Sequence, residues 1–93
     1  MGTFHHGKGE LHGITVAVDT RGTRVWVGRC DTIDEQGVHL LDADQHEAAA
    51  GTPTKSEWLA QAARYGVWAR HPSVLVPAAE VLTVTRLGDL RPA

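Results

Sequence analysis

Apolar and polar side chains alternate through the first half of the chain. This period of two is the pattern of a strand that buries one face and exposes the other. Two polar segments that contain a glycine interrupt the alternation and predict tight turns, the first with Gly22 at a positive φ. The second apolar run contains Gly28, which indicates a bulge or a sharp bend such as a small barrel needs. The three predicted strands are residues 13–19, 24–33 and 38–43.

Helical spacing of apolar residues follows in the second half of the chain. Thr54 and Glu57 stand three residues apart, as in a capping box. The apolar residues behind them recur with a helical period and a glycine follows, so we expect an amphipathic helix over residues 55–65. Two more β-branched runs, 73–76 and 81–87, are separated by only four residues, which leaves room for a tight turn alone.

The chain has 93 residues and a mass of 10.0 kDa, which is enough for one domain. A chain of this length buries only roughly 60% of the surface that its unfolded form exposes, so association with copies of itself would add stability. The single cysteine, Cys30, excludes an internal disulfide. We expect one domain over residues 13–90 with a helical insertion at about 54–66, preceded by a flexible N-terminal segment, residues 1–12.

The formal net charge of −2 excludes the strongly basic surface of many nucleic-acid-binding proteins. Residues 31–54 hold six acidic residues and no lysine or arginine. Such a block either solvates several faces of the fold or forms one acidic surface that faces a partner or a cation. No apolar run is long enough for a membrane span, and residues 1–12 contain no signal-peptide hydrophobic region. A cytoplasmic protein without membrane contact is therefore the expectation.

Two stretches of the chain carry the pattern of a known family. Alternating apolar residues lead through a turn glycine to a strand glycine, an aspartate follows six residues later, and an apolar strand ends in an acidic-small pair. These positions are Val16, Val18, Gly22, Gly28, Asp34, Leu40, Leu41, Asp42 and Ala43. The segment 74–81 looks like a degenerate second signature, in which an apolar pair precedes a tight turn. The chain thus resembles the bacterial Sm-like (LSm) small β-barrel proteins.

This resemblance implies a mainly β fold. It would be a five-stranded, strongly bent antiparallel barrel of the Sm-like (SH3-type) kind, with one short helix inserted between the third and fourth strands. Sm-like barrels pair the fourth strand of one copy with the fifth strand of the next and close into a ring, commonly a hexamer or heptamer. We therefore expect a non-enzymatic, ring-forming module for protein interaction or assembly, with no cofactor. The expected interface residues are Val74, Val76, Val81 and Val84.

RNA binding is the first alternative that the resemblance implies. RNA-binding relatives carry a base-stacking residue and an asparagine in the loop after the aspartate, and an arginine and a glycine in the last turn. This chain has residues 36–38, Gln-Gly-Val, in the first place and Pro77 and Ala78 in the second, so the usual uracil pocket is missing. RNA would have to use other residues, of which the candidates are Gln36, Gly37, His39, Arg64, Arg70 and His71.

A metal site is the second alternative. On an extended strand Asp42, Asp44 and His46 would project to one side, about 6.5–7 Å between neighbours, and could share a divalent ion if the strand end curls. A solvated strand end accounts for the same residues equally well. Cys30 lies within a predicted strand, where a small apolar role is expected rather than a thiolate, and no spacing matches a catalytic signature.

Three tryptophans are more than a core of this size needs. We expect Trp58 and Trp68 to anchor the helix to the barrel. The alternative is that one or more of them lies in a contact with a partner, where tryptophan often dominates the binding energy.

Overall fold

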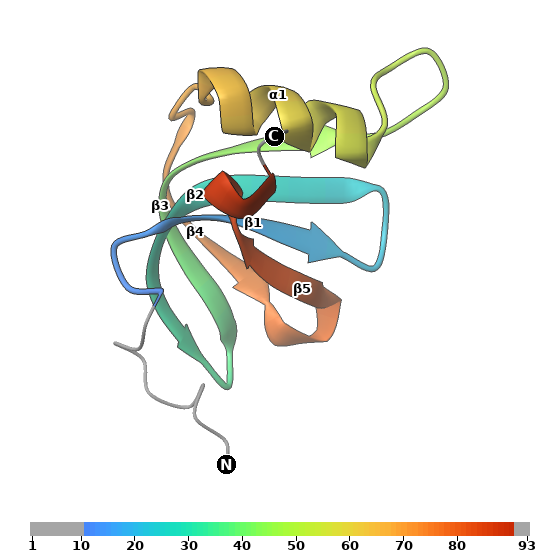
Figure 1. Ribbon diagram of the computed structural model, residues 1–93. Coiled ribbons are helices and arrows are strands. Elements are labelled where there is room, and N and C mark those ends of the chain that lie inside the picture. The colour runs from blue at the N-terminus through green and yellow to red at the C-terminus, as the bar shows by residue number, and fades with distance from the viewer. Residues whose placement is uncertain (1–10, 91–93) are drawn as a thin grey trace.

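Five antiparallel strands form one sheet in the computed structural model, which describes residues 11–90 (Figure 1). The mainly β fold with one α-helix between the third and fourth strands is as predicted. The strands are β1 (Thr15–Thr20), β2 (Arg24–Asp34), β3 (Gly37–Glu47), β4 (His71–Pro77) and β5 (Val81–Arg86). The helices are α1 (Lys55–Tyr65) and two 3₁₀ turns, η2 (Ala78–Glu80) and η3 (Leu87–Leu90). None of the helices within residues 11–90 is long and apolar enough to cross a membrane.

The order of strands in the sheet is β4-β3-β2-β1-β5. The two edge strands β4 and β5 are therefore consecutive in the chain, joined by the three residues of η2. Because so short a connection spans only about 10 Å, the sheet has to bend until its two edges meet at this corner. Figure 1 shows β4 and β5 meeting at the η2 turn, at the lower right of a strongly curved sheet.

The hydrophobic core lies inside this curved sheet. Side chains of alternate strand residues point inward and are buried. They are Val16, Val18, Trp26, Cys30, Val38, Leu40, Ala43 and Val76. The predicted apolar role of Cys30 is confirmed, since it is buried and free of any disulfide.

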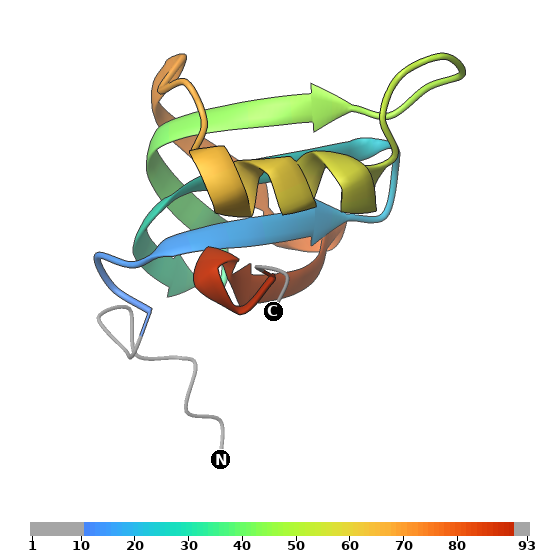
Figure 2. The ribbon, with the colours of Figure 1, turned by 45° about the horizontal axis from the view of Figure 1, so that its top comes forward.

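A second, smaller core lies on the opposite face of β1 and β2, beneath α1 (Figure 2). Ala17 and Val27 belong to this face and pack with Ala62 of the helix and Leu87 of η3. Trp58 packs there too, so its predicted anchoring role is confirmed. The same prediction is wrong for Trp68, which is 74% exposed because it lies beyond the end of α1.

The helix starts and ends as its sequence predicts. The hydroxyl of Thr54 accepts a hydrogen bond from the Glu57 amide at 3.1 Å, and the Thr54 amide donates to the Glu57 carboxylate at 2.8 Å. This reciprocal pair is a complete capping box. At the other end the Gly66 amide donates to the Ala62 carbonyl at 2.8 Å, with Gly66 at φ 80°.

The predicted bulge is present at Gly28. Val27 pairs with Asp44 and Arg29 pairs with Leu41, so two residues of β3, Asp42 and Ala43, lie opposite Gly28 alone. A Cβ atom on Gly28 would stand 2.8 Å from the Ala43 Cβ, closer than two carbons can pack. Beyond the bulge β3 continues to Glu47, four residues past the predicted end.

One expectation about the turns is wrong. Gly22 does not adopt a positive φ, because the connection from β1 to β2 is longer than the two-residue turn that requires one. In the next turn, between β2 and β3, Gly37 does adopt a positive φ, of 142°. A side chain there would collide with the Val76 carbonyl. Residues 1–10 of the predicted flexible segment lie outside the described residues. Leu11 instead packs against the core, and His12 hydrogen-bonds the Asp31 carbonyl at 2.5 Å, so both belong to the domain.

Candidate functional site

The two edges of the sheet are its principal unpartnered feature. Within residues 11–90, β4 pairs only with β3 and β5 pairs only with β1. Each edge strand therefore presents backbone donors and acceptors that no described strand satisfies. Leu75 on β4 and Leu82 on β5 add apolar surface, since they are 40% and 51% exposed. Backbone groups and apolar side chains together form a surface onto which another strand can pair.

The four valines expected at this interface face inward instead. Val76 is fully buried in the core, and Val74, Val81 and Val84 are half-buried and pack against the same core. The more exposed apolar side chains on the two edge strands are their neighbours Leu75 and Leu82. The strand period could have shown this, because Leu75 lies between two inward-facing valines.

The predicted metal residues are each engaged separately. Asp42 forms an ion pair with Arg29 at 3.1 Å, and the His46 Nε2 donates to the Pro53 carbonyl at 2.7 Å while its ring stacks on Trp58. No group of three His, Cys, Asp or Glu side chains within residues 11–90 could hold a metal ion. The regular spacing behind the prediction fails because Asp42 lies in the bulge, at φ 50°.

Asp44 differs from its two neighbours, because it is 5% exposed. Its Oδ1 accepts from the Gln45 amide at 2.9 Å. The guanidinium of Arg70 is 4.0 Å from the same oxygen, beyond hydrogen-bond distance. Among residues 11–90, Asp44 is thus a buried carboxylate whose one described ion pair is long.

The predicted RNA-binding residues do not form one surface. Gln36, Gly37 and His39 lie at the β2–β3 turn, whereas Arg64 lies on α1 at the opposite end of the molecule (Figure 1). Arg70 faces Asp44. The edge of the His71 ring meets Trp26, with the ring centroids 5.2 Å apart and an interplanar angle of 73°. This arrangement lacks the continuous basic track that a single strand of RNA requires.

The β2–β3 turn has local structural contacts of its own. Asp34 accepts a hydrogen bond from the Gln36 amide at 2.9 Å and pairs with the His39 Nε2 at 3.2 Å. The hydrogen bond from the Gln36 amide is the main cause that lowers the pKa of the Asp34 carboxyl, and His39 lowers it further.

Cys30 lies elsewhere, in β2, where burial and the charge of Asp31 raise the pKa of its thiol. Cys30 therefore stays protonated at neutral pH and has no nucleophilic character.

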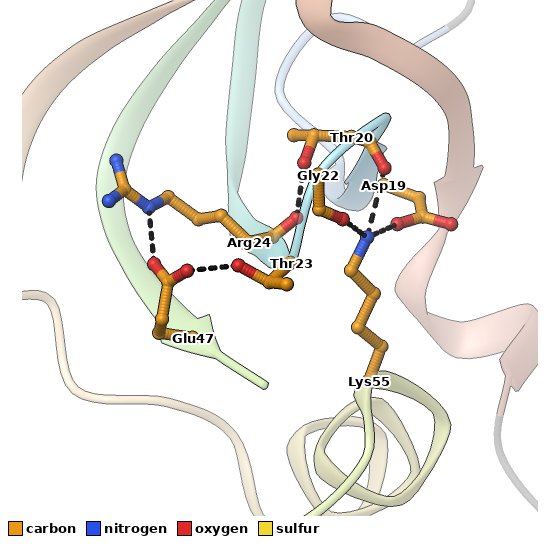
Figure 3. Close-up of polar contacts among 7 residues, drawn as sticks. All are labelled: Asp19, Thr20, Gly22, Thr23, Arg24, Glu47 and Lys55. Atoms are coloured by element: carbon orange, nitrogen blue, oxygen red, sulfur yellow. Dashed lines mark hydrogen bonds and ion pairs between the residues drawn. The ribbon is translucent and has the colours of Figure 1, made fainter. Parts of the chain in front are cut away.

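The ammonium group of Lys55 fastens the start of α1 to the β1–β2 turn (Figure 3). An ammonium group has three hydrogens, and three oxygens accept from this one. They are Asp19 Oδ1 at 2.7 Å, the Thr20 carbonyl at 2.9 Å and the Gly22 carbonyl at 2.5 Å. These partners lie 33 to 36 residues before Lys55, so sequence reasoning missed the contact.

The end of β3 is joined to the same turn (Figure 3). The Glu47 carboxylate accepts from the Thr23 hydroxyl and, at 3.1 Å, from the Arg24 Nε. The hydrogen bond from the Thr23 hydroxyl is the main cause that lowers the pKa of the Glu47 carboxyl, and Arg24 lowers it further. Lys55 and Glu47 thus join α1 and the end of β3 to the β1–β2 turn.

Comparisons with known proteins give the fold and no family. No family model matches the chain, and no curated protein matches it. Among solved structures, a chain of the NatC complex bound to CoA is similar. The two chains share 19% sequence identity with a TM-score of 0.53, over 86% of this chain and 88% of that one. At this identity the likeness shows a shared fold alone, a small β-rich fold of similar length.

Proposed function

We propose that the protein is a non-enzymatic interaction module of the Sm-like kind, in which β4 of one copy pairs with β5 of the next to form a closed ring. The observation that carries the proposal is the topology. Two strands that are consecutive in the chain lie at opposite edges of one sheet, and neither has a second partner within residues 11–90.

A second copy is the occupant that fits both edges at once. The edges are of similar length, since β4 has seven residues and β5 has six. Each copy has one edge of each kind, so head-to-tail pairing repeats until the rotation closes a ring. The resemblance to Sm-like proteins favours a hexamer or heptamer.

Packing gives a second reason for assembly. Val74, Val81 and Val84 are half-buried beside the open edges, and Leu75 and Leu82 are exposed there. A neighbouring strand would cover this apolar surface and satisfy the backbone groups that now face water. The similar solved chain belongs to a complex, which agrees with a role in assembly.

Light scattering after size exclusion tests the proposal. We expect the wild-type mass to be a multiple of 10.0 kDa. Leu75→Lys and Leu82→Lys place a charge on each edge and should reduce the mass to that of a monomer at the same concentration. Trp68→Ala is the matched control, because Trp68 is an exposed apolar residue outside both edge strands, and it should leave the mass unchanged. A wild-type monomer at every concentration, or an assembly that both lysine variants retain, would overturn the proposal.

A further inference from the structure

A cavity of about 200 Å³ opens where α1 ends, and three aromatic side chains line it: Trp58, Tyr65 and Trp68. Trp58 is held in place by the packing of α1 and by His46, whose ring stacks on it with the centroids 5.4 Å apart. Tyr65 and Trp68 are 78% and 74% exposed. Three large aromatic side chains around one cavity offer apolar surface and ring faces to a ligand.

Asp44 also lines this cavity. Its side chain is only 7% exposed, and the one ion pair described for it in residues 11–90, with Arg70, is 4.0 Å long. The Arg70 side chain is itself 65% exposed, so it closes the ion pair only weakly. A buried carboxylate without a close cation gives the cavity a negative potential at low dielectric.

We propose that this cavity binds the methylated ammonium group of a lysine side chain on a partner protein. A cation is attracted to the faces of tryptophan and tyrosine rings, and the Asp44 carboxylate adds a counterion. An unmethylated lysine would have to replace three hydrogen bonds to water, for which the side chains lining the cavity offer Gln61 and Asp44, and Asp44 Oδ1 already accepts from the Gln45 amide. Methyl groups remove those donors, spread the charge and add apolar surface for the rings. The site is separate from the sheet edges and does not depend on the ring.

Calorimetric titration of the full chain tests the assignment. The probes are one short peptide whose single lysine is unmethylated, trimethylated, or replaced by a neutral residue of the same shape as trimethyllysine. We expect the trimethylated peptide to bind at least about 10-fold more tightly than the neutral one, the size of a desolvated cation–π interaction. Equal binding of the charged and neutral peptides would overturn the proposal. So would tighter binding of phosphocholine, because the cavity would then suit a lipid headgroup.

Variants of the cavity locate the site. Trp68→Ala and Asp44→Asn should each weaken the trimethylated peptide about 5-fold or more, by removing a ring face or the counterion. Arg70→Ala should tighten binding, since it removes the cation that competes for Asp44, and weaker binding there would overturn the role of Asp44. Glu35→Gln, in the exposed β2–β3 turn and outside the lining of the cavity, is the control that should leave binding unchanged. Trp68 is largely exposed, so its variant folds even if Asp44→Asn does not, and unchanged binding in Trp68→Ala would refute the site.

Discussion

At the scale of single residues, Gly28 and Ala43 decide how tightly β2 and β3 approach one another. Ala43 is fully buried, and its Cβ occupies the space that a side chain on Gly28 would need. The bulge at Asp42 and Ala43 increases the local twist of the two strands and so helps the sheet to close. The absence of a side chain at position 28 is therefore a packing requirement of the curved sheet.

Replacing Gly28 with alanine should destabilise the fold by about 1–3 kcal/mol, the usual effect of inserting an atom into a packed core. The reason is the 2.8 Å separation that the new Cβ would have from the Ala43 Cβ. Urea unfolding measures the change. Gly22→Ala is the matched control, because nothing lies within 4 Å of a Cβ there and the φ is not positive. If both variants unfold at the same urea concentration, the packing argument fails.

The two glycines also show what a sequence can reveal about single residues. The bulge at Gly28 could be predicted because glycine weakens a strand interior, and it stands there mostly where a bulge or a close backbone approach requires it. The positive φ predicted for Gly22 is wrong. The sequence of a polar turn does not reveal how many residues separate the strands, and only a two-residue turn would require that φ. The outward position of Leu75 could have been predicted from the strand period, because it alternates with Val74 and Val76, which pack against the core.

At the scale of elements, α1 is the clearest case of local and distant causes acting together. The capping box and the glycine that ends the helix are local, so the bounds of residues 55–65 could be predicted correctly. The position of α1 over β1 and β2 depends on Lys55 and on Trp58, whose partners are distant in the chain. The contacts of Lys55 carry no sequence signal, whereas the anchoring role of Trp58 could be predicted from the number of tryptophans. The strand pairings that curve the sheet could be expected from the family resemblance.

Replacing Lys55 with alanine should lower the free energy of unfolding by about 1–3 kcal/mol, because hydrogen bonds from a charged donor are lost. Three acceptors on the β1–β2 turn lose their partner at once. Chemical denaturation measures the loss, and amide hydrogen exchange in α1 should rise with it. Arg64→Ala, at the exposed end of the same helix, should cost less than about 0.5 kcal/mol. Equal losses in the two variants would show that Lys55 does not fasten the helix.

At the scale of the whole molecule, the small core and the open edges both limit the stability of a single copy. A chain of 93 residues gains limited stability from its own interior, and this chain leaves half-buried valines beside both edges. Pairing with a neighbour would bury that surface without any change of fold. Stability and assembly would then be linked, because whatever binds only the folded state stabilises it.

This linkage predicts that the melting temperature rises with protein concentration. A binding partner at about 100 times its dissociation constant adds about 2.7 kcal/mol, and for a domain of this size each kcal/mol raises the melting temperature by about 4–8 °C. Scanning calorimetry over about a 100-fold range of concentration should therefore show a shift of several degrees in the wild type. Leu82→Lys should remove the dependence, whereas Trp68→Ala should keep it. A wild-type melting temperature that is independent of concentration would mean that the folded chain is stable alone and that its edges do not pair.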